Sequence, residues 1–380
     1  MKAYKYKLRV NAKFQQSAEK TLEICRELYN AALQERRDAF KINHLSFNYQ
    51  TQQNQLPEIK EIRPDLNEVF SQVLQNVLKR VERGFQAFFR RVRNGEKPGY
   101  PRFRSSSRYN SFTYPQSGFR LEGNKLYLSK IGSVRLRLSR PVEGRIKTCT
   151  IKREADGWYV IFAVEENQSR FIPKTGDSVG LDVGLESFAT LSTGEQIDNP
   201  RFLRESEREL KTAQRRVSRR RNKRSNRRRK AVKLLAKKHQ KVARQRLDFF
   251  HKTSLNILRE FDEVAIEDLN IKGMVKNHGL AKSIGDAAWG TFASVLEGKA
   301  ESAGRQVVRV PAAFTSQDCS QCGQRIRKSL ATREHLCGCG FVAHRDHNAA
   351  INIIARAERS GMVSVGKSCE PRISTYSRQA

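Results

Sequence analysis

The stretch SVGLDVGLESFATLSTGEQID, residues 178–198, predicts two buried strands joined by a tight turn. Asp182 lies in the middle of the first strand, where a carboxylate is costly unless it binds something. A further buried strand, FDEVAIEDL at 261–269, carries Glu267 near its end, and Asp346 directly precedes the helical run HNAAINIIARAE. Carboxylates from two strands and one helix start can surround one or two divalent cations. The three residues therefore predict a site for two magnesium ions, or manganese, suited to phosphodiester hydrolysis.

Each carboxylate also has a plain structural interpretation. Asp346 could simply cap a helix, Glu267 could end a surface strand, and Asp182 could stabilise a turn. GLDVG is, moreover, typical of the nucleotide site of actin-like ATPases and sugar kinases. No second glycine-rich phosphate loop follows here, and the strongly basic segment described below has no role in that interpretation.

The charge of the chain points to a polyanionic partner. The 380 residues include 73 Lys and Arg against 39 Asp and Glu, a net charge of +34. Such a field favours nucleic acid over other partners. The length predicts two or three domains. No apolar run approaches the roughly 18 residues that span a bilayer, and MKAYKYKLRVNAKF lacks the apolar core of a signal peptide. We therefore expect a cytoplasmic protein without a membrane partner.

Residues 201–247 concentrate this charge, with 21 Lys and Arg, 3 Glu and a net charge of +18. Sparse apolar residues keep a helical period across 201–260, and NKRSN at 222–226 predicts a break, so the segment reads as a helical hairpin. Self-repulsion would oppose its folding unless phosphates neutralise it, although a solvated face is the plain alternative. The candidate phosphate-backbone contacts are Arg215, Arg216, Arg219, Arg220, Arg221, Arg227, Arg228 and Arg229. Aromatic and basic residues also alternate in YPRFRSSSRYNSFTYP, 100–115, as in surfaces that stack bases.

Four of the seven cysteines gather in one polar segment, as C-x2-C followed by C-x-C. Cys319, Cys322, Cys337 and Cys339 have the spacing of a tetrahedral zinc site. The second pair is one residue shorter than usual, so His335 or His344 could replace one thiolate. A closed set of four ligands leaves no position for water, and the predicted role is structural. The scattered Cys25, Cys149 and Cys369 do not resemble a disulfide framework.

The remaining pattern alternates helices and strands. Residues 1–14 predict a strand, a helix follows from Ser17, and a second helix covers about 66–93 before GEKPGYPRF ends it. Residues 108–170 predict β-structure with a hairpin turn at Asp156-Gly157. Pattern alone leaves two arrangements open: the first strand joins the later ones, or the helical and β parts are separate domains. DAAWGTFASVLEGKAESAG predicts a helix and RQVVRVP a strand, and the tail after about 360 is expected to be disordered.

Six motifs occur together in this order: KPGYPRFR, VGLDVGLESFATLS, VAIEDLNIKGM, DAAWGTF, TSQDCSQCG and CGCGFVAHRDHNAAIN. Their combination resembles the TnpB family of transposon-encoded, RNA-guided DNA nucleases, which are related to type V CRISPR effectors. The resemblance covers residues 1 to about 357. It implies a multidomain α+β and α/β fold, in which a β-barrel wedge domain and a helical recognition insertion are followed by an RNase H-like (RuvC) nuclease domain with a zinc-ribbon insertion. The implied ranges are 1–14 and 100–170 for the wedge, 15–99 for the recognition domain, 171–315 and 342–358 for the nuclease, and 316–341 for the zinc insertion. The resemblance does not cover the tail, residues 359–380.

The resemblance also implies roles for individual residues. Asp182, Glu267 and Asp346 match the catalytic carboxylates, Arg345 stands beside them, and the four clustered cysteines match the zinc ligands. The positions matching those that read a short duplex motif next to the target are Phe47, Thr51, Ser71, Gln72, Gln75 and Thr113. The C-x-C pair, and His344 where an acidic residue is common, depart from the family pattern.

The implied activity is that of a guide-RNA-dependent endonuclease that cuts double-stranded DNA. Its partners would be one guide RNA and the target DNA, and one chain would act with one RNA in a prokaryotic cytoplasm. One alternative is a strand-transferring transposase of the same superfold, for which the sequence shows no helix-turn-helix. Another is a catalytically inactive RNA-guided repressor, against which the intact carboxylate set argues.

Overall fold

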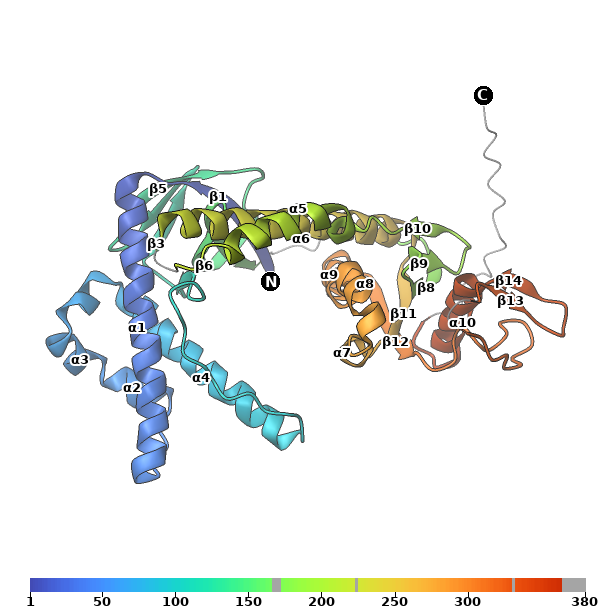
Figure 1. Ribbon diagram of the computed structural model, residues 1–380, viewed down its shortest axis with the longest axis horizontal. Coiled ribbons are helices and arrows are strands. Elements are labelled where there is room, and N and C mark those ends of the chain that lie inside the picture. The colour runs from blue at the N-terminus through green and yellow to red at the C-terminus, as the bar shows by residue number, and fades with distance from the viewer. Residues whose placement is uncertain (166–171, 223–224, 330–331, 364–380) are drawn as a thin grey trace. The chain divides into compact units, whose positions relative to one another are not determined.

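The computed structural model describes residues 1–165, 172–222, 225–329 and 332–363. The chain divides into two compact units, Met1–Gln168 and Ser169–Ala380 (Figure 1). The predicted disordered tail falls almost entirely outside the described residues. None of the helices in the described parts is long and apolar enough to cross a membrane.

The first unit is built on a seven-stranded antiparallel sheet in the order β2-β6-β7-β1-β5-β4-β3. The first strand of the chain lies in the middle, where it pairs with β7 and β5. This resolves the open arrangement, since the N-terminal strand joins the later ones. The strands are β1 (Lys2–Arg9), β2 (Ser111–Tyr114), β3 (Phe119–Glu122), β4 (Lys125–Leu128), β5 (Gly132–Arg137), β6 (Arg145–Glu154) and β7 (Gly157–Glu165).

The connection between the two end strands requires this sheet to curl. β2 ends at Tyr114 and β3 begins at Phe119, a path of at most about 18 Å. In a flat sheet, seven strands spaced about 4.8 Å apart would hold the end strands roughly 29 Å apart. The hydroxyl of Tyr114 also donates to the carbonyl of Ser129, just after β4, at 2.8 Å. The end strands therefore approach each other, as in a barrel.

Helices between β1 and β2 pack on this sheet and share one hydrophobic core with it. The first helix begins at Ala12 rather than Ser17, because the Asn11 side chain accepts from the backbone N of Phe14 at 2.8 Å and caps it. The last begins at Ser71 rather than 66, because Pro64–Glu68 forms a separate 3-10 turn. The helices are α1 (Ala12–Asn43), α2 (Tyr49–Asn54), α3 (Leu56–Ile62) and α4 (Ser71–Arg93).

The second unit contains a five-stranded mixed sheet in the order β10-β9-β8-β11-β12. The first three strands are antiparallel neighbours, and β11 runs parallel to both β8 and β12. The strands are β8 (Ser178–Val183), β9 (Ser187–Leu191), β10 (Gln196–Asp198), β11 (Glu263–Asp268) and β12 (Gln306–Pro311).

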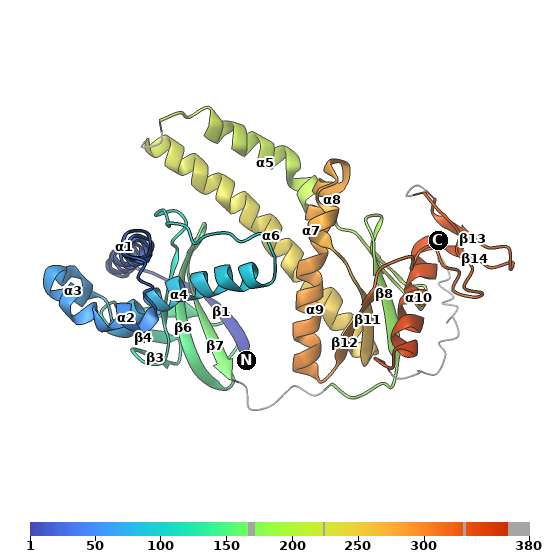
Figure 2. The same cartoon turned by 90° about the horizontal axis from the view of Figure 1, so that it is seen from below.

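Helices cover both faces of this sheet (Figure 2). One face packs against α6 (Asn226–Glu260), α8 (His278–Ala287) and α9 (Trp289–Ala303), and the other against α10 (Arg345–Arg359). The predicted helix over 286–304 is divided, because Ala288 has φ 50° and separates α8 from α9. The remaining elements are α5 (Phe202–Ser218), α7 (Ile271–Met274) and the hairpin strands β13 (Glu334–Leu336) and β14 (Val342–His344).

Candidate active site and zinc knuckle

The alternation of side chains along two parallel strands brings the first two carboxylates together. Val179 and Leu181 of β8, and Val264 and Ile266 of β11, belong to the core that α6 and α9 cover. Because successive strand residues face opposite sides, Asp182 and Glu267 lie on the α10 side. Leu181 is paired with Ile266, so the two acidic residues follow at the same level.

Gly180 lets α10 pack directly on β8. A Cβ added at Gly180 would collide with the carbonyl oxygen of Ala350 and would lie 2.9 Å from the backbone N of Ile354. This close approach brings the N-terminus of α10 to the end of β8, and a Cβ added at Gly184 would lie 3.4 Å from Asp346 Oδ2. The structure thus places the three predicted carboxylates on one face of the sheet.

Asp346 lies in the first turn of α10 and is buried. It is not the helix cap, because the Nδ1 atom of His344 accepts from the Asp346 backbone N at 3.3 Å. The plain interpretation of Asp346 as an N-cap is therefore wrong. Its carboxylate has no such local task.

The electrostatic environment of the site disfavours negative charge when no cation is bound. Burial raises the pKa of Asp182 well above its ordinary value, the charges of Glu267 and Asp346 raise it further, and Arg345 lowers it. Burial also raises the pKa of Glu267, against the opposing effects of a hydrogen bond from Thr315 and the charge of Arg356. The charges of Glu267 and Asp346 thus add to the effect of burial on Asp182, and the cluster forms a site that a cation would stabilise.

Two neighbours, Thr315 and Arg345, lie beside these carboxylates, and the sequence analysis missed the first of them. The buried hydroxyl of Thr315 donates to Glu267 Oε1. Arg345 donates to the carbonyl of Ser329 at 2.9 Å and to the hydroxyl of Ser316 at 3.2 Å. Thr315 opens the motif TSQDCSQCG, but nothing in that pattern separates a supporting hydroxyl from an ordinary loop residue.

The four predicted zinc ligands converge. Their sulfur atoms all lie within 4.8 Å of one another, with 3.9 Å between Cys319 and Cys339 and 3.5 Å between Cys322 and Cys337. Four sulfurs at about 2.3 Å from a tetrahedral zinc would lie about 3.8 Å apart, so the cysteines fit the ion. Among the described residues this group comprises cysteines alone. His335 and His344 do not belong to this group of four.

The zinc knuckle, residues 316–344, is tied to α10 by asparagine side chains. Asn348 and Asn352 donate to the carbonyl of Asp318, at 2.9 and 2.7 Å, and Asn348 accepts from the backbone N of Ser320 at 3.0 Å. Both asparagines are buried. The first cysteine turn is thus fixed to the helix that carries Asp346.

The candidate DNA-reading residues occupy one region of the first unit. Ser71, Gln72 and Gln75 lie in the first turns of α4, Thr51 lies in α2, and Phe47 lies in the loop before it. Ser71 accepts from Lys60 at 3.1 Å and Gln72 from the backbone N of Ser117 at 3.3 Å. On β2, Thr113 already bonds Arg80 at 3.0 Å and Thr150 at 2.8 Å, so its hydroxyl is engaged within the fold.

The predicted basic hairpin, residues 201–247, consists of α5 and the part of α6 up to residue 247 (Figure 1). A depression of about 510 Å³ there is lined by Thr212, Arg215, Arg216, Arg219, Arg220 and Arg227. Arg228 instead closes the hairpin, since its Nε donates to the carbonyl of Arg220 at 2.9 Å. Arg221 lies in the connection and Arg229 in the first turn of α6.

Known proteins are similar to this chain in both fold and sequence. Family models described as "Probable transposase", "Cas12f1-like, TNB domain" and "Helix-turn-helix domain" match residues 161–278, 289–353 and 1–44. In the structure, however, residues 1–44 contain one strand, β1, and one continuous helix, α1. A Cas12f1 chain solved with sgRNA and target DNA matches with a TM-score of 0.56 and 14% identity, over 91% of this chain and 86% of that one. This match confirms the predicted fold class.

Similar sequences identify the family. A Streptomyces pristinaespiralis protein named "Putative RNA-guided DNA endonuclease" is 36% identical, over 93% of this chain and 89% of the relative. An Escherichia coli K12 protein with the same description is 30% identical, over 93% and 92%. A mimivirus protein named "TnpB-like protein L79" is 25% identical over 57% of this chain and 44% of its own length. The chain belongs to the TnpB family.

Proposed function

We propose that this protein is an RNA-guided, metal-dependent endonuclease that cuts double-stranded DNA. The observation that carries the proposal is the convergence of Asp182, Glu267 and Asp346 on the α10 side of the second sheet. The names of the two relatives that cover most of the chain, and the Cas12f1 fold, support the RNA-guided part.

The three carboxylates would hold two magnesium or manganese ions. Among the described residues only the four cysteines form a metal-ligand group within 4.8 Å, so the carboxylates are spaced more widely. That spacing suits ligands that flank two ions about 3.5–4 Å apart. When bound, such ions activate the attacking water and stabilise the leaving oxygen. Thr315 holds Glu267 in orientation, and Arg345 supplies positive charge beside Asp182.

Guide RNA would cover the basic hairpin and leave its spacer bases free for pairing with DNA. The arginines around the 510 Å³ depression can donate hydrogen bonds to backbone phosphates, and such contacts carry no sequence information. Target choice would therefore rest on RNA–DNA pairing, while the α4 residues Ser71, Gln72 and Gln75 contact a short adjacent duplex. Thr113 would act through Arg80. We propose one chain with one RNA in a prokaryotic cytoplasm, and zinc as a structural ion.

The test loads the protein with guide RNAs that differ only in the spacer and offers one DNA duplex with magnesium. We expect cleavage only with the matched spacer, and none from the Asp182→Ala variant, which still binds RNA and target. Equal cutting with a mismatched spacer or no RNA contradicts guidance. Strand-joined products would favour a transposase, and tight target binding by the wild-type protein without cutting would favour a repressor.

A further inference from the structure

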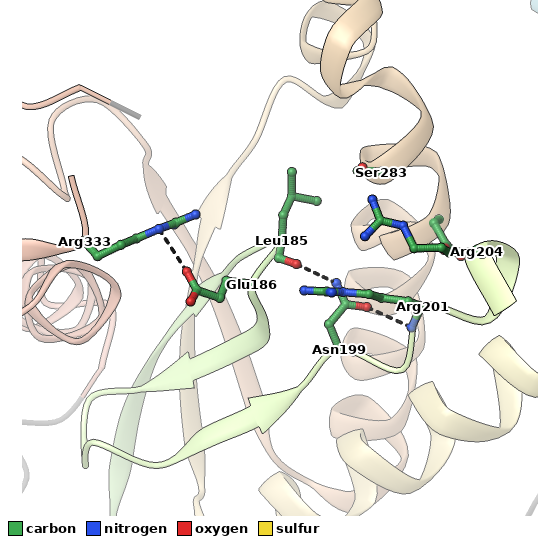
Figure 3. Close-up of a pocket in the computed structure, with 8 residues that line it drawn as sticks. Leu185, Glu186, Asn199, Arg201, Arg204, Ser283 and Arg333 are labelled. Atoms are coloured by element: carbon green, nitrogen blue, oxygen red, sulfur yellow. Dashed lines mark hydrogen bonds and ion pairs between the residues drawn. The ribbon is translucent and has the colours of Figure 1, made fainter. Parts of the chain in front are cut away.

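A cavity of about 410 Å³ opens beside the carboxylate site and is lined largely by charged side chains (Figure 3). Its volume lies within the range of about 300–1,000 Å³ that is usual for ligand sites. Its lining includes Leu185, Glu186, Arg201, Arg204, Asp286 and Arg333. These residues come from the β8–β9 turn, the start of α5, α8 and the zinc knuckle, and all belong to the second unit.

The acidic groups of this cavity are already engaged. Asp286 accepts from the backbone N of Leu203 at 3.0 Å and of Arg204 at 3.2 Å, and it pairs with Arg246 at 2.9 Å. Glu186 pairs with Arg333 at 2.9 Å. The guanidinium groups of Arg201 and Arg204 are therefore left without a carboxylate in the cavity, and Figure 3 shows both directed toward the same space.

The backbone at Arg201 is an independent sign that this side chain has a task. Arg201 has φ 47° and ψ 40°, the left-handed region that favours glycine or asparagine. Its conformation is fixed by Asn199, which accepts from the Arg201 backbone N at 3.2 Å and donates to the Leu185 carbonyl at 3.0 Å. Asn199 thus joins the strained residue to the turn that follows Asp182. An arginine at a position that disfavours any Cβ suggests that its guanidinium is used.

The cavity adjoins the proposed catalytic carboxylates. Leu185 comes three residues after Asp182, a separation of at most about 11 Å along the chain. Gly184, between them, lies against Asp346. The cavity therefore lies within reach of the first few nucleotides beside a strand position held at the carboxylates.

We propose that the cavity is a phosphate clamp for the DNA strand being cut, in which Arg201 and Arg204 bind one backbone phosphate next to the scissile one. Paired guanidinium groups match the oxygens of a phosphate, and charge-assisted hydrogen bonds of this kind fix geometry as well as affinity. The clamp rests on the proposed nuclease function and deepens it, because it sets the position of the strand. Arg201 and Arg204 are positioning residues.

The experiment compares wild-type protein with Arg201→Gln/Arg204→Gln, each loaded with matched guide RNA. Arg259→Gln/Arg359→Gln removes the same charge from exposed positions outside both the cavity and the hairpin segment 201–247, and serves as the control. We expect single-turnover cleavage to fall about 10- to 100-fold in the clamp variant, with target binding unchanged, and to stay within about twofold in the control. Arg204→Gln alone leaves the strained Arg201 in place and keeps the test valid if the double variant does not fold.

A neutral methylphosphonate, placed at each position near the scissile bond in turn, tests the contact directly. At one position the methylphosphonate should slow cleavage by the wild-type protein. It should have no further effect in the clamp variant, because that variant already lacks the contact. The clamp alone is overturned if the substitution slows both proteins equally at every position. It is also overturned if the clamp variant cleaves the unmodified target at the wild-type rate. Failure of the wild-type protein to cut a matched target overturns the nuclease function, and the clamp with it.

Discussion

At the scale of single residues, the site combines groups that are unfavourable without a ligand. Asp182 is a buried carboxylate that faces two others, and Arg345 offsets their charge only in part. Such a cluster lowers the stability of the metal-free fold, and a bound cation removes this destabilisation.

Replacing Asp182 with Asn should therefore stabilise the protein in magnesium-free buffer while abolishing cleavage. Removing one like charge from the cluster should raise the free energy of unfolding by about 1–2 kcal/mol, or the Tm by roughly 2–8 °C. Magnesium should raise the Tm of the wild type and have little effect on the variant.

The matched control is Asp268→Asn, one residue beyond Glu267 and exposed to solvent. Its Tm should shift by no more than about 1–2 °C, since surface changes of this kind stay within about 0.5 kcal/mol. A lower Tm for Asp182→Asn than for wild type would show that the carboxylates do not repel one another.

Gly180 makes a packing contact that the sequence alone does not reveal. A glycine inside an apolar strand signals close approach of another backbone, but not which one. The approaching backbone belongs to α10, about 170 residues later in the chain. The carboxylates themselves were predictable because each lies in or beside an apolar run, where a charged residue is uncommon unless it binds something.

Gly180→Ala should displace α10 and, with it, Asp346. Overpacking should cost about 1–3 kcal/mol in the free energy of unfolding, and cleavage should fall on the order of 100-fold. Gly298→Ala in α9 has open space around the added Cβ and should gain about 0.5–1 kcal/mol. Urea unfolding and single-turnover cleavage measure both effects. Similar outcomes for the two variants would contradict the packing role of Gly180.

At the scale of elements, the zinc knuckle supports the start of α10. Asp318, next to Cys319, accepts from the amides of Asn348 and Asn352, and Arg345 bonds Ser316 and Ser329 within the knuckle. Structural zinc supplies folding free energy directly, so its loss should loosen the first turn of α10.

Cys319→Ser/Cys322→Ser should lose about one zinc per chain and most of its cleavage activity. RNA binding should persist, because the basic hairpin is a separate element. Cys25→Ala, a buried cysteine of the first unit, should keep its zinc. Elemental analysis measures the zinc, a filter-binding assay the RNA affinity and single-turnover cleavage the activity. Full activity of a zinc-free double variant would show that α10 does not depend on the knuckle.

Elements with strong periodicity were predictable, and those set by local hydrogen bonds were not. The strands of both sheets and the helices α1, α4, α6, α9 and α10 carry regular apolar spacing. The short helix α2 is mostly polar and is held by tertiary contacts, such as the bond from Arg36 to Gln52 at 2.7 Å. The break at Ala288 depends on a left-handed residue without a glycine signal.

At the scale of the whole molecule, the net charge of +34 needs a partner of opposite charge. Its densest part is the hairpin segment 201–247, with +18. Arg228 is used to close the hairpin and is not freely available for binding, while Arg215, Arg216 and Arg219 line the open depression. The sequence alone does not distinguish these arginines. The fold shows which of them bond within the protein and which are available to bind phosphate.

RNA binding should therefore depend steeply on salt, in proportion to the phosphates that the hairpin engages. Each contact contributes about 0.7–0.9 to the slope of log K against log salt, because bound cations are released. Replacing Arg215, Arg216 and Arg219 with Gln should reduce that slope by roughly 2–3. The control replaces Arg259, Lys272 and Lys276, which are exposed residues of the same unit outside the hairpin, and should leave the slope nearly unchanged. Guide RNA titrated at several potassium concentrations gives both slopes. Equal reductions in the two triple variants would mean that RNA responds to total charge, and the hairpin would then lose its assigned role as the RNA-binding element.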